Sequence, residues 1–269
     1  MNWNQLKERL INSRYYYFHT DNGVLLCGDC LKVLPLIPDE SIDLVVTSPP
    51  YNIGIDYGIC KDNLEWNEYL SWNNKWINEI YKVLRDDGRF VLNVLVNVNS
   101  QNIRQQPLLD FGNLIRKNKL KIHAITFWID ATRVKYTAWG SWKSASMPYI
   151  YNPFEAIIIS YKNSWKKLKK GKDTISKEDF IKGVSGIYNF GTEKRKFNPA
   201  PFPYKLPALF IELLTFKDEV VLDPFIGSGT TAVACERLNR RWIGIEINPE
   251  YCGVTKQRVL REIRQLKIF

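Results

Sequence analysis

The chain has 269 residues, of which 45% are hydrophobic and 13% aromatic. This composition excludes a disordered chain and allows one large α/β domain with an insertion. The formal net charge of +10 favours a polyanionic partner, because Lys and Arg can replace condensed counterions along phosphates. Charge alone does not separate nucleic-acid-binding proteins from other basic proteins, so the motifs must decide.

The cysteines predict a reducing compartment. Five cysteines occur without regular spacing, and the sequence contains neither a signal peptide nor a long apolar span, which predicts a cytoplasmic protein. Cys27 and Cys30 have the spacing of half a zinc site, but no second pair exists, and His19 and His123 are the only histidines. We therefore expect ordinary thiols and no metal site.

Apolar, β-branched runs alternate with stretches of helical amphipathic spacing. The runs predict buried parallel strands over residues 24–27, 43–46, 90–96, 122–129, 156–161, 220–222 and 242–245. Helices are predicted over residues 64–84, 101–119, 206–214, 230–240 and 249–269. The alternation predicts an α/β fold with a mostly parallel, doubly wound sheet and helices on both faces.

Residues 162–196 interrupt this alternation with a basic stretch. They hold eleven Lys or Arg against four Asp or Glu, interleaved with aromatic side chains, which are Trp165, Phe180, Tyr188 and Phe190. We expect an insertion outside the sheet that faces DNA, and a solvated charged loop is the alternative. The predicted organisation is a catalytic domain over 22–161 and 198–269, an inserted recognition segment over 162–197 and an N-terminal extension over 1–21.

A glycine-rich turn, VVLDPFIGSGTT at residues 220–231, leads from a predicted strand into a predicted helix. Gly227 and Gly229 allow positive φ or a close approach of a ligand, and Ser228 or Thr230 can cap the helix. No Lys follows the second glycine, so a triphosphate is not expected. Glu246 ends the next predicted strand, where a carboxylate can accept both ribose hydroxyls of a nucleoside cofactor.

A proline-rich turn, TSPPYN at residues 47–52, follows the predicted strand 43–46. Two prolines fix the backbone and remove two N–H donors, which leaves a rigid turn rich in acceptors. Such a turn suits an amino group conjugated with an aromatic ring, a poor nucleophile whose hydrogens must be bound. Ser48 Oγ and the Pro49 carbonyl are the expected acceptors, and Tyr51 is expected to stack on an extruded base. Taken alone, the motif also fits a stiff loop.

These two turns resemble motifs I and IV of the β-class S-adenosylmethionine-dependent DNA amino-methyltransferases of restriction-modification systems. Residues 198–203, NPAPFP, resemble motif X of that family, although Asn198 stands where His is frequent. Residues 27–31, CGDCL, resemble motif III. Motif IV precedes the basic segment and motifs X and I follow it, which is the β-class order. The resemblance covers nearly everything from Val24 to Tyr251.

The resemblance implies a Rossmann-like methyltransferase domain that transfers a methyl group from S-adenosyl-L-methionine to an exocyclic amino group of double-stranded DNA, by base flipping and direct transfer. Ser in the first position of motif IV is typical of N4-cytosine enzymes and Asp of N6-adenine enzymes. Ser48 therefore favours cytosine N4, with adenine N6 as the alternative. A homodimer and a cognate restriction endonuclease are further implied partners. Residues 139–148 resemble a family loop near the target base, where Trp139 and Trp142 would stack on or wedge into DNA, or pack in the core or in a lid.

The family's site residues carry over to two sets of positions. The implied catalytic residues are Ser48, Pro49, Pro50 and Tyr51. The implied cofactor-binding residues are Asp29, Phe202, Pro203, Asp223, Pro224, Phe225, Gly227, Ser228, Gly229, Thr230, Thr231 and Glu246. A helix cap is the alternative for Asp29, and core packing is the alternative for Phe225.

Three alternative functions differ from methylation of an amino group in DNA. Cytosine C5 methylation is excluded, because it requires a cysteine nucleophile that usually follows proline, and no cysteine here follows a proline. Methylation of RNA or of a protein glutamine uses related Pro-Pro-Tyr turns and stays open. A nucleic-acid-binding module with a vestigial cofactor fold would bind the cofactor without transferring a methyl group.

Overall fold

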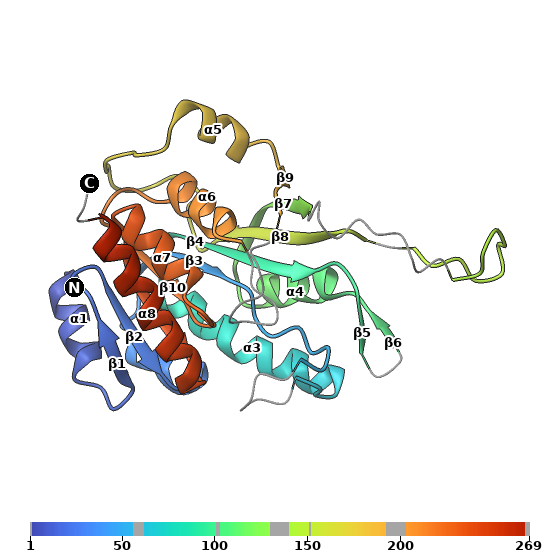
Figure 1. Cartoon of the computed structure of the whole chain (residues 1–269), viewed down its shortest axis with the longest axis horizontal. Coiled ribbons are helices and arrows are strands. Elements are labelled where there is room, and N and C mark those ends of the chain that lie inside the picture. Colours follow the sequence, from blue (N-terminus) through green and yellow to red (C-terminus); the bar gives the residue numbers. More distant parts are fainter. Residues whose placement is uncertain are drawn as a thin grey trace.

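The computed structural model describes residues 2–55, 62–100, 103–129, 140–150, 152–191 and 203–266. A nine-stranded sheet forms its centre, in the order β1-β2-β11-β10-β3-β4-β8-β7-β9 (Figure 1). The strands are β1 (Tyr16–His19), β2 (Gly23–Cys27), β3 (Ile42–Thr47), β4 (Leu84–Leu95), β5 (Val98–Ser100), β6 (Ile103–Gln105), β7 (Lys121–Ile129), β8 (Phe154–Tyr161), β9 (Ile187–Asn189), β10 (Val220–Asp223) and β11 (Arg241–Glu246). The short strands β5 and β6 form a separate hairpin.

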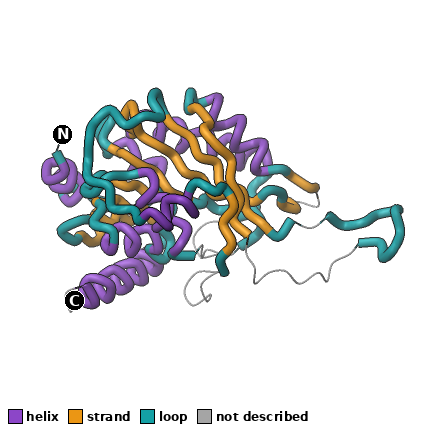
Figure 2. The backbone as a smooth tube through the Cα atoms, turned by 90° about the horizontal axis from the view of Figure 1, so that it is seen from above, coloured by secondary structure: helices purple, strands orange, loops and turns teal. Residues whose placement is uncertain are grey.

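Helices cover both faces of the sheet, as predicted (Figures 1 and 2). The helices are α1 (Trp3–Ile11), α2 (Cys30–Val33), the 3-10 turn η1 (Leu34–Leu36), α3 (Trp66–Val83), α4 (Pro107–Lys117), α5 (Lys177–Gly183), α6 (Lys205–Leu214), α7 (Thr230–Arg237) and α8 (Pro249–Leu266). One hydrophobic core lies between the sheet and α1 to α4, and a second lies between the sheet and α6 to α8. None of the described helices is long and apolar enough to cross a membrane.

The central strands β2, β11, β10, β3 and β4 are parallel, which confirms the predicted sheet type. All six residues of β3 and all four of β10 are buried. Strands covered on both faces by helices have no solvent side, so their sequences are continuous apolar runs.

The prediction of a parallel strand is wrong for residues 156–161, whereas residues 122–129 run in the same direction as the central strands. β8 pairs antiparallel with both β4 and β7, so it enters the sheet between them as a hairpin partner of β7. Along β7, buried and exposed positions largely alternate, since this strand lies next to the sheet edge. An apolar run specifies a strand but not its direction, which is set by the path of the connecting loop.

The prediction that the basic insertion lies wholly outside the sheet is also wrong. The insertion begins after β8, where Lys167 pairs with Glu219 at 2.8 Å and Leu168 N donates to Asp87. This part lies at the amino ends of the parallel strands. The chain then forms α5 and returns as β9, which pairs in parallel with β7 as the last strand of the sheet. The missed strand is only three residues long, too short for a sequence period to emerge.

The N-terminal extension also joins the sheet. Strand β1 pairs antiparallel with β2 and forms the opposite edge. Helix α1 begins with a capping box, in which Asn2 and Gln5 exchange side-chain-to-backbone hydrogen bonds. The helix buries Trp3, Leu6 and Leu10. These residues close the first core at this edge.

Candidate active site

A cavity of about 400 Å³ opens at the carboxyl ends of the parallel strands, between β10 and β3. Strand connections run in opposite directions from this point, and such a switch point is where open α/β sheets bind ligands. The volume falls in the range of small-molecule sites. The residues that line it are Gly28, Asp29, Cys30, Ser48, Pro49, Pro50, Tyr51, Asn52, Asp62, Leu64, Tyr69, Trp72, Pro224, Phe225, Ile226, Gly227, Ser228, Thr230, Ile245, Glu246, Ile247 and Tyr251.

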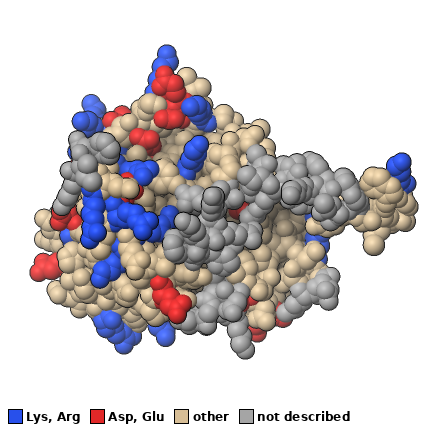
Figure 3. Space-filling model, viewed as in Figure 1, with Lys and Arg blue, Asp and Glu red and all other residues tan. Residues whose placement is uncertain are grey.

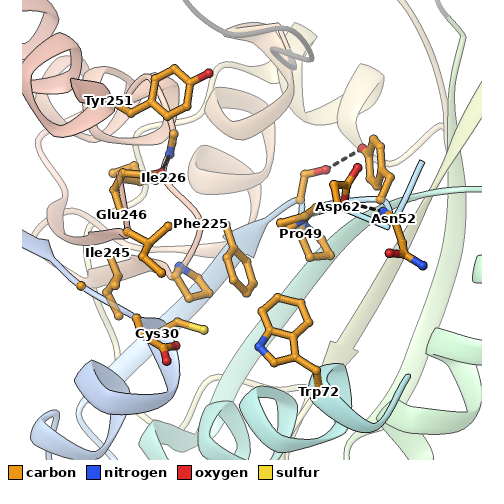
Figure 4. A pocket seen from close by; sticks show the side chains of 18 of the residues that line it. Cys30, Pro49, Asn52, Asp62, Trp72, Phe225, Ile226, Ile245, Glu246 and Tyr251 are labelled. Atoms are coloured by element: carbon orange, nitrogen blue, oxygen red, sulfur yellow. Dashed lines mark hydrogen bonds between the residues drawn. The ribbon is translucent and has the colours of Figure 1, made fainter. Parts of the chain in front are cut away.

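The cavity has two halves. The cofactor half is formed by the β10–α7 turn, residues 224–230, with Asp29 and Glu246. The catalytic half is formed by residues 48–52 and the side chains behind them. Phe225 lies between the two halves, with Pro49 on one side and Ile226 and Glu246 on the other (Figure 4).

The β10–α7 turn needs both of its glycines. Gly227 has φ +52° and Gly229 has φ +84°, which confirms the expected positive φ. A Cβ on Gly229 would lie 2.7 Å from Thr255 Cγ2 on α8. The tight turn therefore brings α7 and α8 together, and it exposes the backbone of residue 227 to the cavity.

The expected helix cap by Ser228 or Thr230 is wrong. Gly229 is the N-cap of α7, and no side chain of the described residues caps that end. Arg258 on α8 instead donates to Ser228 Oγ at 2.9 Å and to Thr230 Oγ1 at 3.2 Å, and also to the Ser228 carbonyl. The two hydroxyls are thus engaged by a guanidinium that lies about thirty residues away in sequence, a contact that local spacing cannot reveal.

Asp223 is only 1% exposed and is absent from the cavity lining. Its Oδ1 accepts from Thr47 Oγ1 at 2.7 Å and from Phe225 N, and its Oδ2 accepts from Thr231 Oγ1 at 2.6 Å. Burial raises its pKa to about 6. The Asp223 side chain therefore ties the turn to β3 from inside the protein, and its role in binding the cofactor stays a prediction.

Glu246 lines the cavity at the end of β11, where the sequence placed it. Its Oε2 accepts from Gly227 N and its Oε1 from Asn248 N, both at 2.9 Å. Burial raises its pKa. An ionised carboxylate offers about four lone-pair sites, so these two bonds orient the group and leave acceptor capacity for the hydroxyls of a ribose.

The remaining predicted cofactor residues divide into two groups. Asp29 lines the cavity and also caps α2, since its Oδ1 accepts from Leu31 N at 3.0 Å. Pro224 and Phe225 line the cavity as well, and Phe225 packs edge-on against Trp76 with ring centroids 5.1 Å apart. The alternatives, a helix cap for Asp29 and core packing for Phe225, are thus confirmed, while a contact of either residue with a cofactor stays a prediction. Three further residues do not line the cavity: Pro203, Gly229 and Thr231. Phe202 and residues 198–201 lie outside the described residues.

The four predicted catalytic residues all line the cavity. Ser48 Oγ lies 2.6 Å from Tyr51 Oη, and Tyr69 Oη donates to the Pro50 carbonyl at 2.7 Å. The turn is therefore fixed from the α3 side as well as by its two prolines. The Tyr51 hydroxyl donates to Glu155 on β8 at 3.0 Å, and stacking of its ring on an extruded base stays a prediction.

Three residues that the sequence did not predict as site residues support this turn: Asp62, Asn93 and Glu155. Asp62 accepts from Asn52 N at 2.7 Å and from Ile53 N at 3.0 Å, while Asn52 adopts φ +58°. Asn93 and Glu155 contact Tyr51. Asn93 interrupts the apolar run of β4, and Glu155 precedes that of β8, so a buried polar residue in each strand was the available signal.

Two further predictions concern sites elsewhere. Residues 140–150 extend away from the sheet (Figure 1), and Trp142 within them is 65% exposed and absent from the cavity lining. Trp139 lies outside the described residues. Cys30 is buried and lines the cavity, and no group of three or more metal-ligating side chains occurs within the described parts of the chain.

A model of the DNA methylases of the N6/N4 methyltransferase family matches residues 42–257, which span both halves of the cavity. The chain belongs to this DNA methylase family. The methylase is 40% identical over 175 residues to the type II methyltransferase M.MjaVI of Methanocaldococcus jannaschii, which covers 65% of this chain and 89% of that protein. It is 30% identical to M.PvuII of Proteus hauseri over 90% of this chain and 85% of the relative.

Solved structures agree with this assignment. The PvuII DNA methyltransferase, described as cytosine-N4-specific, superimposes with a TM-score of 0.70 at 26% identity and covers 89% of this chain and 86% of its own. A DNA modification methylase of Thermus thermophilus, TTHA0409, in complex with S-adenosyl-L-methionine, also gives 0.70 at 28% identity, covering 88% of this chain and 93% of its own. The predicted α/β methyltransferase fold of the methylase is thus confirmed.

Proposed function

We propose that the methylase transfers a methyl group from S-adenosyl-L-methionine to the exocyclic N4 of cytosine in double-stranded DNA. The observation that carries this proposal is the position of Ser48, an acceptor side chain in a rigid turn on the wall of the cavity that Glu246 and the glycine turn also line. The similarity to a PvuII enzyme described as cytosine-N4-specific supports the choice of base.

The cofactor half fits a nucleoside that carries a charged methionine tail. Gly227 approaches the cavity through its backbone, and the Glu246 carboxylate is positioned for ribose hydroxyls. Asp29 and Ile247 lie on the same wall, where an adenine would contact both a polar and an apolar group. The cofactor would supply a methyl group on a sulfonium, which is already reactive and needs no covalent enzyme intermediate.

The catalytic half prepares the amino group. Ser48 Oγ and the Pro49 carbonyl accept its two hydrogens, which turns the nitrogen lone pair toward the cofactor half and out of conjugation with the base. The base must leave the duplex to reach this turn, at a cost of a few kcal/mol in stacking and pairing. Most of the acceleration then comes from alignment of the two reactants.

Product analysis tests this proposal directly. Purified protein is incubated with isotopically labelled cofactor and, separately, duplex DNA, RNA and a protein extract, and modified nucleosides are identified by mass after digestion. We expect N4-methylcytosine in duplex DNA, and Ser48→Ala should abolish its formation. N6-methyladenine would replace the cytosine proposal with adenine N6, and label in RNA or protein alone would refute the choice of substrate.

Three wider predictions of the sequence go with this function. A homodimer, a cognate restriction endonuclease and a cytoplasmic location follow from the resemblance and from the cysteine usage, and they stay predictions. Sedimentation at several protein concentrations would test the dimer. The recognition sequence can be identified by mapping the methylated positions in random duplex DNA.

A further inference from the structure

Behind the catalytic turn lies a chain of hydrogen-bonded polar groups that ends on a buried carboxylate. Ser48 Oγ lies 2.6 Å from Tyr51 Oη, and Tyr51 Oη donates to Glu155 Oε2 at 3.0 Å. Asn93 Nδ2 donates to the same carboxylate oxygen at 2.6 Å and to Tyr51 Oη at 2.9 Å. Glu155 is 8% exposed and Asn93 is 3% exposed, so these hydrogen bonds are largely shielded from water.

The sheet brings these groups together from distant parts of the sequence. Asn93 lies on β4 and Glu155 on β8, and the antiparallel register pairs Leu95 with Glu155. Residues two apart on a strand share a face, so Asn93 and Glu155 are diagonal neighbours on one side of the sheet. Ser48 continues β3, the strand on the other side of β4.

The direction of the Ser48–Tyr51 bond follows from its neighbours. Either hydroxyl could be the donor when the pair is considered alone. Glu155 Oε2 accepts a hydrogen bond from Asn93 Nδ2, and an amide nitrogen only donates. The single Tyr51 hydrogen therefore points to Glu155, and Tyr51 Oη accepts from Asn93. Ser48 must then donate to Tyr51 Oη, or to the Asn93 carbonyl at 3.4 Å.

We propose that Glu155 is a positioning residue whose carboxylate keeps Ser48 Oγ as a hydrogen-bond acceptor for the amino group of the target base. With the Ser48 hydrogen directed into the protein, the lone pairs of Ser48 Oγ are presented to the cavity. This inference rests on the proposed amino-group methylation, and it holds for cytosine N4 and adenine N6 alike. Both target groups offer hydrogens and need acceptors.

The orientation of Asn93 supports an acceptor at position 155. Asn93 Oδ1 is buried and has no hydrogen-bond partner among the described residues, while Nδ2 makes two bonds. An unsatisfied buried oxygen costs free energy. The two hydrogen bonds that Asn93 Nδ2 donates, to Glu155 Oε2 and to Tyr51 Oη, offset the cost of leaving Oδ1 unbonded. An amide at position 155 allows the hydrogen bonds from position 155 through Tyr51 to Ser48 to reverse their direction.

Glu155→Gln is the decisive variant, because it keeps the size of the side chain and removes the obligate acceptor. An amide nitrogen at this position donates to Tyr51 Oη, the Tyr51 hydrogen turns to Ser48 Oγ, and the Ser48 hydrogen turns toward the amino group. We expect kcat for methyl transfer to duplex DNA to fall about 100-fold, as when one preorganised polar contact of an active site is lost. KM for DNA and the calorimetric Kd for the cofactor should stay within about twofold.

Two companion variants separate positioning from structural support. Glu155→Asp keeps the carboxylate on a shorter side chain and should retain more activity than Glu155→Gln, whereas a residue that only fills space would show the reverse order. Glu8→Gln, an exposed glutamate on α1, is the matched control and should equal the wild type. The melting temperature of each variant reports whether the fold is intact.

A double variant and a spectroscopic readout complete the test. In a Tyr51→Phe background, Glu155→Gln should lower kcat by less than about threefold, because the link to Ser48 is already broken. The carbon-13 Cζ resonance of Tyr51, assigned by its loss in Tyr51→Phe, should move in Glu155→Gln as the phenol loses its carboxylate acceptor. The NMR measurement needs no substrate.

The results that would overturn the proposal are distinct from those that would overturn the choice of base. Equal kcat in wild type and Glu155→Gln, additive losses in the double variant, or an unmoved Tyr51 resonance each refute the positioning role. A wild type that forms N6-methyladenine refutes the cytosine proposal and leaves the expected order of the Glu155 variants unchanged. A wild type without activity on DNA refutes the substrate, and the resonance alone then decides whether Glu155 directs Tyr51.

Discussion

In the cofactor half of the cavity, Glu246 accepts hydrogen bonds from the backbone of Gly227 and Asn248, within and beside the turn that it supports. In the catalytic half, Tyr51 is held by side chains from β4 and β8. The first arrangement needs a short motif and one nearby acid, whereas the second needs three strands in a defined register. The two halves should therefore fail differently when single residues are changed.

The largest expected effect breaks the catalytic half alone. Ser48→Ala removes an acceptor for the amino group, and transfer should slow by about 100- to 1,000-fold in single-turnover measurements. Cofactor affinity, measured by calorimetry, should stay within about twofold, because Ser48 has no role in the glycine turn. A matching loss of cofactor affinity would show that the two halves are not separable.

The next effect breaks the cofactor half. Glu246→Gln replaces one acceptor oxygen with a donor, which opposes either Gly227 N or Asn248 N and weakens the contact with ribose hydroxyls. Charge-assisted hydrogen bonds contribute about 1.5–3 kcal/mol, so the cofactor Kd should rise by about 10- to 100-fold. At saturating cofactor, kcat should change by less than about threefold. Glu250→Gln, an exposed neighbour on α8, is the control.

Asp223 joins the two halves through Thr47, and its titration should appear in stability. Burial raises its pKa from 3.8 to about 6, so the folded state holds a proton that the unfolded state releases between these values. This group therefore makes the free energy of unfolding fall as pH rises from about 4 to about 6, and its contribution is constant outside that window.

Asp223→Asn should reduce this pH dependence. The difference between the melting temperatures at about pH 4.5 and about pH 7 should shrink by a few degrees relative to the wild type, because a shift of this size corresponds to at most about 3 kcal/mol. Part of the dependence should remain, since burial also raises the pKa of Asp43 to about 6. Asp218→Asn changes an exposed acid and should leave the difference unaltered.

The smallest expected effect concerns the basic insertion. Lys169 and Lys170 are exposed, but they border a second cavity with Asp87 and Glu219 at the amino ends of the strands, away from the catalytic half. Lys169→Gln with Lys170→Gln should change DNA affinity by less than about twofold, and the slope of log Kd against log salt should be unchanged. If the double variant lowers the slope of log Kd against log salt by about two, the two lysines contact DNA phosphates in the wild type.

On the face that carries α7 and α8, basic side chains gather over these helices (Figure 3). Helix α8 contributes Lys256, Arg258, Arg261 and Arg264. Part of this charge is structural, since Arg258 binds the hydroxyls of Ser228 and Thr230. The net charge of the sequence therefore does not report where DNA binds, because ion pairs and caps use some of the cations.

Much of the fold was predictable because its signals are local. The strands β3, β10 and β11 are buried, apolar runs, and the helices α3 and α8 that follow β3 and β11 are amphipathic. Strand direction was predictable only where a helix crosses between neighbours, as from β3 through α3 to β4. It failed for β8, since a hairpin and a crossover leave the same apolar pattern. The helix predicted from residue 101 begins only at Pro107, after the hairpin of β5 and β6.

The sequence by itself determined which residues form the two turns of the site, because glycines permit positive φ and paired prolines restrict the backbone wherever they occur. It also placed Glu246 and Ser48 at strand ends, and strand ends meet at one edge of a parallel sheet. Only the tertiary structure decided what stands behind those turns. Asp223 proved to be a buried tie to Thr47, and Glu155 came to Tyr51 across the β4–β8 register. Hydrogen bonds between side chains far apart in sequence depend on packing and register, which no local pattern encodes.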